Sequence, residues 1–464
     1  MHSKLVTSRA WRRLAVVASV AVVLGANATT VATAADGWVA TWATAQQGAW
    51  ATPAAPAGLT PPGEFQATIY FTQPDAVRYA LPDSTATDQT FRMIVRPDLW
   101  GTTVRFRFSN VFGTSPLVIG TADVGLQAVA AEIIGGTSVP ITFGGKPGVS
   151  IAAGERVFSD PVTLGFVSDA TRAVLAGRNL AVSFAISGSA TALSHHGSAY
   201  TTSYIGAPKS GDHAADNSGD AFPYTTSSWF VLDAIDVMAP DETPVVVAIG
   251  DSITDGTLGT NNVNDRWPDV LASRLHAALG EHVSVVNEAI NANATVVDMV
   301  GQSALKRLER DVLGVSGVKT VVLLEGINDL GAMGVTADAL IDGYKQIVAT
   351  LHAHHIRAVG GTITPALFPG DFALSTLGAQ YGAGYGGAAT DAARKVVNDF
   401  IRNSGLFDAV VDFDAAILDP ATGSMRAEYA PNSMGGAGDY LHPNHGGYLA
   451  MGEAVDLKAL LPAS

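Results

Sequence analysis

Residues 245–256 read VVVAIGDSITDG, an apolar run that stops abruptly at a glycine and then turns polar. An unbroken apolar run of this kind is typical of a strand that is buried on both faces, as in the parallel sheet of an α/β protein. Side chains that follow such a strand lie at the carboxyl edge of the sheet, where α/β proteins bind ligands. Ser252 is the candidate there, because its hydroxyl becomes a nucleophile once a base takes its proton.

Two later segments offer the groups that such a nucleophile needs. Residues 439–443 read DYLHP, and an acid three residues before a histidine can orient the imidazole and stabilise its protonated form. Asp439 and His442 are therefore the predicted acid and base. Residues 323–329, LLEGIND, are a second hydrophobic run that ends in polar groups, and we expect them to supply an oxyanion donor. Together the three segments predict the chemistry of a serine esterase.

From residue 245 onward, predicted strands and helices alternate. This rhythm predicts a mostly parallel sheet in a three-layer α/β sandwich. Residues 365–390, rich in Gly, Ala and Tyr, interrupt it as a long insertion near the same edge, either a lid or a plain surface loop. The further strands are expected at 283–286, 320–324, 358–363 and 409–413, and the helices at 267–279, 295–313, 336–354, 389–404 and 447–460.

The chain before residue 240 has a different pattern of polar and apolar residues. Residues 103–109 and 180–187 alternate polar and apolar side chains, which is typical of half-buried strands. Short strands between Gly, Pro, Asp and Ser turns predict an all-β sandwich or jelly-roll domain over residues 35–240. Residues 49–63 are expected to be an extended loop, and residues 239–244 a linker to the α/β domain, residues 245–464.

Residues 1–34 have the three parts of an export signal. Four basic residues precede the apolar stretch 14–25, and Ala32-Thr33-Ala34 offers a cleavage site. The sequence thus predicts a bacterial-type signal peptide and a secreted protein, extracellular or periplasmic. The pair Arg12-Arg13 leaves twin-arginine export open, and an uncleaved anchor is the alternative to cleavage. No later apolar stretch is long enough to span a bilayer, so no integral membrane association is expected.

Composition narrows the function further. The chain has 464 residues, a formal net charge of −15 and no cysteine. A chain so acidic has no electrostatic route to nucleic acid or to anionic lipid. The lack of cysteine excludes disulfides, thiolate catalysis and cysteine-ligated zinc. We predict no cofactor and no metal.

The three motifs, in this order, resemble those of the SGNH hydrolases, the GDSL-type esterases and lipases. The resemblance covers residues 245–461 and rests on Gly250-Asp251-Ser252, Gly326-Ile327-Asn328-Asp329 and Asp439-x-x-His442. It implies a flavodoxin-like parallel sheet and hydrolysis of carboxylic esters without a cofactor. It also implies Ser252 as nucleophile, Asp439 and His442 as acid and base, and an oxyanion hole that includes the Ser252 N–H and the Asn328 side chain.

The second motif of that family is where this sequence departs. Residues 287–293 read NEAINAN, so Ala289 and Ala292 replace the two glycines of the family pattern. The resemblance implies the Ala292 N–H as a further oxyanion donor, and an alanine serves there if its φ is negative. Its methyl group is expected to narrow the acyl site.

Several alternatives stay open. The first class is a serine hydrolase: an esterase that acts on acetylated polysaccharide, short-chain ester or lipid, or a lipase or phospholipase of the same family. The second is a carbohydrate-binding protein whose α/β domain is catalytically silent. The third is a metal-dependent phosphoesterase. The β domain is expected to be an accessory module that shapes the cleft or binds a polymer, with Trp38 and Trp42 either in its core or exposed to stack on sugars.

Plainer interpretations exist for single residues. Ser252 alone would be explained as a helix cap, and His445 competes with His442. Asp251, Asp255 and Asp329 are expected to hold turns through bonds to the backbone. The remaining histidines considered are expected at surface or packing positions: His195, His196, His352, His354 and His355.

Overall fold

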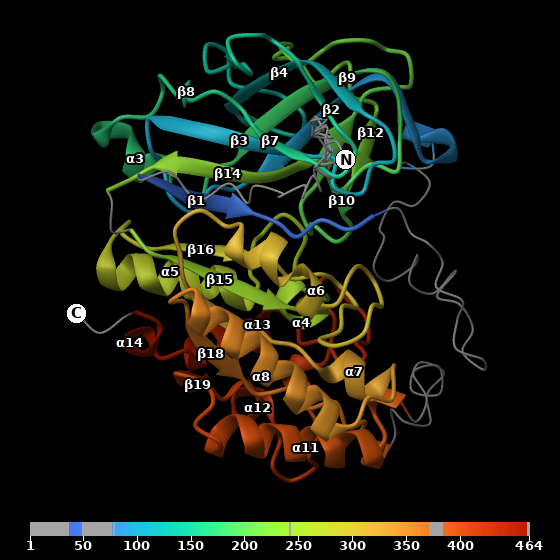
Figure 1. The fold of residues 1–464 in the computed structure, drawn as a ribbon, viewed down its shortest axis with the longest axis vertical. Helices are drawn as coiled ribbons and strands as arrows, with labels where there is room; N and C mark the ends of the chain where they lie inside the picture. Colours follow the sequence, from blue (N-terminus) through green and yellow to red (C-terminus); the bar gives the residue numbers. More distant parts are fainter. Residues whose placement is uncertain (1–36, 49–76, 78, 241–242, 371–383, 462–464) are drawn as a thin grey trace, which may run out of the picture. The chain divides into compact units, whose positions relative to one another are not determined.

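A computed structural model describes residues 37–48, 77, 79–240, 243–370 and 384–461 (Figure 1). Contacts group Ala34–Ser464 into one compact unit, and every described residue belongs to it. The predicted signal peptide, the predicted loop 49–63 and residues 371–383 of the insertion lie outside the described residues. Among the helices of the described part, none is both long and apolar enough to cross a membrane.

A parallel sheet is built from the apolar runs after residue 244, as the sequence predicts. Its strand order is β16-β15-β17-β18-β19, and each neighbouring pair is parallel. Every residue of β15, which lies between β16 and β17, is buried, and this explains its unbroken apolar sequence. The bounds are β15 Val245–Gly250, β16 Ser284–Asn287, β17 Val318–Leu324, β18 Arg357–Gly361 and β19 Ala409–Val411.

Helices connect these strands and form two groups, one for each face of the sheet. Helix α5 contacts α13 in one group, and α8 contacts α6 and α11 in the other (Figure 1). The α-helices are α4 Ser252–Asp255, α5 Trp267–Leu279, α6 Ala304–Leu308, α7 Ile327–Gly331, α8 Ala337–Ala353, α11 Ala388–Asn403, α12 Phe413–Ile417, α13 His445–Ala454 and α14 Leu457–Leu460. A π-helix η2 spans Glu309–Leu313, and a 3-10 helix η3 spans Ala427–Tyr429.

Two predicted helices differ from the observed ones. The helix expected over 295–313 begins only at Ala304 and continues as η2, and the N–H groups of Thr295 and Val296 donate to the Asp329 carboxylate at 2.7 and 2.9 Å. The closing helix expected over 447–460 is two helices, since Asp456 accepts from the N–H of Lys458 and starts α14 anew.

The residues before 240 form antiparallel sheets. The first of the two larger sheets has the order β1-β14-β3-β7, with β8 also on β3. The second has the order β12-β11-β2-β9-β4-β5, with β6 also on β4, and β10 and β13 pair in a separate two-stranded sheet. The bounds are β1 Trp38–Ala43, β2 Thr85–Val95, β3 Thr103–Ser109, β4 Leu117–Leu126, β5 Val139–Ile141, β6 Val149–Ile151, β7 Arg156–Phe158, β8 Val162–Thr163, β9 Leu180–Thr191, β10 His195–His196, β11 Ser203–Ile205, β12 Tyr224–Thr226, β13 Trp229–Phe230 and β14 Leu232–Met238. A short helix α3 spans Asp169–Leu175, and a 3-10 helix η1 spans Pro82–Ser84.

Side chains of the two antiparallel sheets share a core. Phe108 of β3 packs edge-on against Phe184 of β9, with 5.7 Å between the ring centroids. Hydrogen bonds also join this region to the α/β region: the N–H of Ala40 donates to the carbonyl of Ser316, just before β17, at 2.9 Å, and the N–H of Val285 in β16 donates to the Asp98 carboxylate at 2.7 Å. The β region is therefore bonded directly to the region that carries the candidate nucleophile.

Candidate active site

Ser252 is placed by the tight turn that ends β15. A Cβ on Gly250 would lie 2.3 Å from the Leu324 carbonyl oxygen, so no larger residue fits there without movement of the backbone. Asp251 then caps α4, accepting from the N–H of Ile253 at 3.0 Å. The cap is thus Asp251, so the interpretation of Ser252 as a mere helix cap does not apply, and its hydroxyl is available to other partners.

The hydroxyl of Ser252 faces His442. Ser252 Oγ lies 2.8 Å from His442 Nε2, and His442 Nδ1 lies 2.6 Å from Asp439 Oδ2. The second oxygen of Asp439 accepts from the backbone N–H groups of Leu441 and His442, at 3.0 and 2.8 Å. All three side chains are buried. The structure therefore joins the predicted nucleophile, base and acid in one hydrogen-bonded chain.

The charge of Asp439 suits its position beside the imidazole. Burial alone favours the neutral acid, but His442 and the two backbone donors outweigh it and lower the pKa of Asp439 below its ordinary value. An ionised Asp439 holds the proton on Nδ1 and leaves Nε2 to accept from the serine. The arrangement can therefore generate an alkoxide nucleophile at Ser252.

Asn328 is presented by a similar strand-to-helix turn after β17. Gly326 has φ +130°, a conformation that L side chains rarely adopt, and a Cβ there would meet the Tyr344 hydroxyl at 2.7 Å. Asn328 Nδ2 donates to the Asn293 carbonyl at 2.7 Å, and its Oδ1 accepts from the Tyr385 hydroxyl at 2.8 Å. These two bonds fix which way the amide points and leave the second hydrogen of Nδ2 for another acceptor.

Ala292 differs from its expected conformation. Its φ is +56°, in the left-handed region, whereas the sequence-based expectation was an ordinary negative φ. A backbone that needs this conformation explains why glycine suits the position, and alanine there carries strain. Its neighbours are held on both sides: the N–H of Asn291 donates to Asp255 at 2.8 Å, and the carbonyl of Asn293 accepts from Asn328.

The other acidic residues near the site bond to the backbone, as predicted. Asp251 and Asp329 accept from main-chain N–H groups, and so does Asp255. Burial raises the pKa of Asp251 to about 7, although His442 nearby acts in the opposite direction. Glu325 is also buried, and burial raises its pKa well above the ordinary value. The floor of the site is therefore rich in carboxyl groups that favour the neutral form.

The competing residues lie elsewhere. His445 is exposed at the start of α13, and His352, His354 and His355 are exposed as well. Trp38 and Trp42 are buried, and Trp42 meets Trp229 edge-on at 5.0 Å, so these two tryptophans belong to the core and offer no face to a sugar. Within the described residues, no group of three or more His, Cys, Asp or Glu side chains is arranged to hold a metal ion.

Two residues near the site were not singled out from the sequence. Tyr385 contacts Asn328, but it stands in the irregular insertion, where no motif marks it. His196 was expected at a surface or packing position; it is buried, and its Nε2 lies 3.0 Å from Asp255 Oδ1. No periodicity or spacing signals this contact, because it joins two segments that are distant in sequence.

Comparison with known proteins gives one family and several similar folds. Residues 248–450, less than half of the chain, match the model of the GDSL-like lipase/acylhydrolase family. Among curated proteins, none matches this sequence.

Several solved structures are similar to part of this chain. A putative lipolytic protein of the G-D-S-L family from Desulfitobacterium hafniense is 20% identical, with 45% of this chain and 96% of that chain covered and a TM-score of 0.33. A lipase/acylhydrolase from Enterococcus faecalis is 22% identical, with 46% and 92% covered and a TM-score of 0.34. A carbohydrate acetylesterase family member from Sinorhizobium meliloti is 18% identical, with 46% and 94% covered and a TM-score of 0.34. None of these likenesses identifies a substrate for this chain.

Proposed function

Residues 248–450 of this chain belong to the GDSL-like lipase/acylhydrolase family of SGNH hydrolases, and from this premise we propose that the protein is a secreted serine hydrolase that cleaves carboxylic esters through an acyl-enzyme. The observation that carries the proposal is the buried chain of hydrogen bonds from Ser252 through His442 to Asp439. A hydroxyl, an imidazole and a carboxylate in this order are the parts of a serine nucleophile with its general base.

In the proposed reaction His442 Nε2 takes the Ser252 proton as Oγ attacks the ester carbonyl. Asp439 holds the imidazole in place and stabilises the imidazolium that forms. The tetrahedral intermediate then expels the alcohol, which receives the proton from His442. Water, with His442 again as base, hydrolyses the acyl-enzyme and restores the Ser252 hydroxyl.

The oxyanion of each tetrahedral intermediate needs donors that are fixed before it forms. We assign this role to the second Nδ2 hydrogen of Asn328 and to the backbone N–H groups of Ser252 and Ala292. The two bonds that orient the Asn328 amide support the assignment, as does the link from Asn328 to the residue that follows Ala292. The φ of Ala292 is positive and does not meet the condition set from the sequence, so the assignment of its N–H rests on the bonds that hold its two neighbours.

Two experiments test this function. Labelling by a fluorophosphonate probe reports an activated serine, and it should require Ser252, with Ser252→Ala as the control. A panel of p-nitrophenyl esters of increasing acyl length then distinguishes a short-chain or acetyl esterase from a lipase. A protein that is neither labelled nor active on any ester of the panel would favour the silent, carbohydrate-binding alternative.

The remaining parts of the proposal concern the first 240 residues. We propose residues 1–34 as a signal peptide, supported by their basic front, apolar stretch and Ala32-Thr33-Ala34. N-terminal sequencing of protein recovered outside the cell should then begin at Ala35. We propose residues 35–240 as a β-sandwich domain, which is supported by the two antiparallel sheets and by the aromatic contacts between them.

A further inference from the structure

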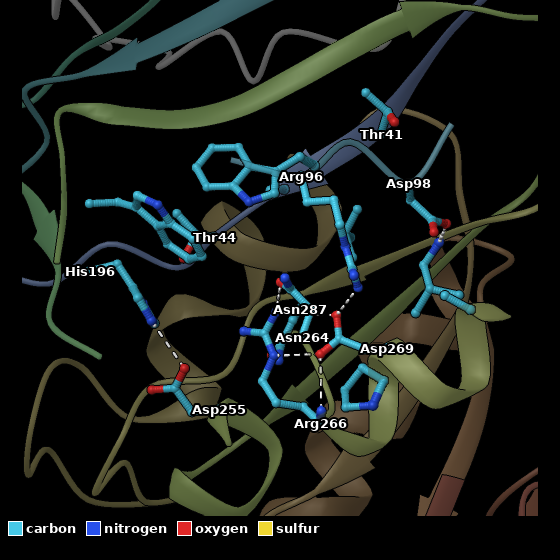
Figure 2. A pocket seen from close by; sticks show the side chains of 17 residues that line it. Thr41, Thr44, Arg96, Asp98, His196, Asp255, Asn264, Arg266, Asp269 and Asn287 are labelled. Carbon is cyan, nitrogen blue, oxygen red and sulfur yellow. Dashed lines mark hydrogen bonds and ion pairs between the residues drawn. The ribbon is translucent and has the colours of Figure 1, made fainter. Parts of the chain in front are cut away.

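A second buried histidine–aspartate pair lies close to the nucleophile. Asp255 ends the short helix α4 that Ser252 begins, and His196 comes from β10 of the antiparallel region. His196 Nε2 lies 3.0 Å from Asp255 Oδ1, and both side chains are buried (Figure 2). The pair therefore connects the antiparallel region to the helix that carries the nucleophile.

The partners of His196 fix its protonation. Nδ1 lies 3.0 Å from the Ala45 carbonyl, which can only accept a hydrogen bond, and Nε2 faces a carboxylate. Burial alone would lower the pKa of His196, but Asp255 and the backbone acceptors outweigh it and raise the pKa. Both ring nitrogens of His196 thus face acceptors, and the raised pKa favours the doubly protonated imidazole.

The second oxygen of Asp255 holds the segment that contains Ala292. Asp255 Oδ2 accepts from the N–H of Asn291 at 2.8 Å, directly before Ala292. The Asn291 side chain donates to Thr257 Oγ1 at 2.7 Å, and the Tyr200 hydroxyl reaches the same oxygen at 2.9 Å. Asn291 is therefore anchored by Asp255 and Thr257. His196 and Tyr200, both from the antiparallel region, bond to these two anchors.

The bonds to Asn291 help to hold Ala292 in its strained left-handed conformation. A non-glycine residue in the left-handed region keeps that conformation only when its surroundings impose it. Asn291 is bound to Asp255 on one side, and the Asn293 carbonyl is bound to Asn328 on the other. If the first anchor weakens, Ala292 can relax, and its N–H then turns away from the proposed oxyanion position.

The neighbouring cavity is too small to give the pair a different role. Its volume is about 50 Å³, room for a few water molecules and not for a substrate. Figure 2 shows His196 and Asp255 at one side of it and the ion pair of Arg266 with Asp269, at 2.7 Å, at the other. The unpaired Thr44 hydroxyl also lines this cavity. These features suit trapped water and a structural role for the pair.

We propose that His196 is a positioning residue for the ester hydrolysis inferred above: through Asp255 and Asn291 it fixes Ala292 beside Ser252. The proposal rests on the proposed function, since it assigns His196 to the same oxyanion site. It also gives the antiparallel region a part in catalysis, in place of a purely accessory one. His196 itself touches neither substrate nor nucleophile.

The test compares His196→Gln with His195→Gln in the full-length protein. His195 is the adjacent buried histidine of β10, but it stacks on Phe230 at 5.7 Å and its Nδ1 faces the Leu193 carbonyl, so its replacement disturbs the same strand without touching Asp255. On p-nitrophenyl acetate we expect His196→Gln to lower kcat about tenfold with KM within twofold. The rate of fluorophosphonate labelling should fall in parallel, and His195→Gln should keep the wild-type kcat.

Hydrogen exchange provides a readout that needs no activity. Residues 288–296 should exchange faster in His196→Gln than in His195→Gln. A wild-type kcat in folded His196→Gln, an equal loss in both variants, or unchanged exchange of this segment would overturn the proposal while the esterase function stands. A wild-type protein inert to every ester and to the probe would instead overturn the function and, with it, the catalytic role of His196.

Tyr200→Phe keeps the proposal testable if His196→Gln does not fold. It removes one hydroxyl from the Thr257 anchor and leaves the ring in place. We expect kcat to fall about twofold to threefold with an unchanged KM. Wild-type kinetics together with wild-type exchange of residues 288–296 would count against the proposed anchoring.

Discussion

The buried pairs His442–Asp439 and His196–Asp255 share the same two side chains but differ in what the second ring nitrogen faces. For His442 that partner is the Ser252 hydroxyl, which can donate or accept, and for His196 it is the Ala45 carbonyl, which can only accept. Ser252 can therefore pass a proton to His442, whereas both ring nitrogens of His196 face acceptors. The same pair of residue types is thus proposed as a base in one place and as a positioning element in the other.

The largest expected effect on activity comes from loss of the proposed nucleophile Ser252 or of its proposed base His442. His442→Ala and Ser252→Ala should each lower kcat/KM for ester hydrolysis by about 10⁴–10⁶, because attack and proton transfer act as a unit. His445→Ala is the control and should be mild, since that side chain is exposed on α13. The opposite ranking of the two histidines in steady-state assays would mean that the base is assigned wrongly.

The next largest effect is expected at Asn328, the side chain proposed as an oxyanion donor. Asn328→Ala deletes a proposed oxyanion donor and should lower kcat by about 10²–10³ with little change in KM. Asn328→Asp is a useful companion, because it keeps the shape but presents a negative charge to the oxyanion and should be at least as damaging. Wild-type turnover in either variant would remove Asn328 from the oxyanion site.

A third buried acid, Asp251, bonds to a backbone N–H where Asp439 and Asp255 each face an imidazole, and its pKa predicts a pH dependence of stability. Its pKa rises from 3.8 to about 7 on folding, so the stability gained from the neutral form is complete below about pH 4 and is lost as the pH rises towards 7. The slope for this one group is up to about 1.4 kcal/mol per pH unit.

Asp251→Asn should flatten that slope, because an asparagine can still accept from the Ile253 N–H but does not titrate. Urea unfolding between pH 4.5 and 7.5 measures the free energy of unfolding of both proteins. The free energy of unfolding of the variant should increase relative to that of the wild type as the pH rises. Parallel curves would show that Asp251 is already ionised in the folded protein at low pH.

A smaller effect is expected from the outer support of Asn328. Tyr385→Phe removes the hydroxyl that donates to Asn328 Oδ1 at 2.8 Å and keeps the ring. The amide should lose part of its fixed orientation, and kcat should fall about twofold to tenfold, the effect of one neutral hydrogen bond. Steady-state kinetics give the answer, and a change confined to KM would indicate that Tyr385 contacts substrate instead.

The smallest effect is expected at Ala292, where the structure reverses part of the sequence-based expectation. With φ at +56°, Ala292→Gly removes strain as well as a methyl group. The free energy of unfolding should stay equal or rise by up to about 1 kcal/mol, where an ordinary φ would give a small loss. Activity should hold or rise, most visibly on bulky acyl groups, and a large loss would contradict the oxyanion site proposed here.

The parallel sheet and the neighbours of Ser252 were within reach of sequence analysis because their signals are local. An unbroken apolar run marks β15, and an acid three residues before a histidine marks the last motif, Asp439-x-x-His442. Helix 295–313 was predicted to start too early; it begins at Ala304, and the N–H groups of Thr295 and Val296 are bound by Asp329, a residue far along the chain. Local periodicity contains no information on such a contact.

The conformation of Ala292 and the role proposed for His196 were out of reach for related reasons. Alanine disfavours the left-handed region, so its identity argues against the φ that it has, and only the surrounding anchors impose it. His196 meets Asp255 across 59 residues of sequence, without a repeat or a spacing that would link them. Contacts of this kind are decided by how the strands are assembled.

The distance in sequence between Ser252 and His442 also sets the order of events during synthesis. The nucleophile comes directly after the first strand of the parallel sheet, but its base is 190 residues further along, next to the final helices. A growing chain therefore displays the serine before the histidine that is proposed as its base has been made. The proposed catalytic site is complete only once the turn after β15 and the segment before α13 have met.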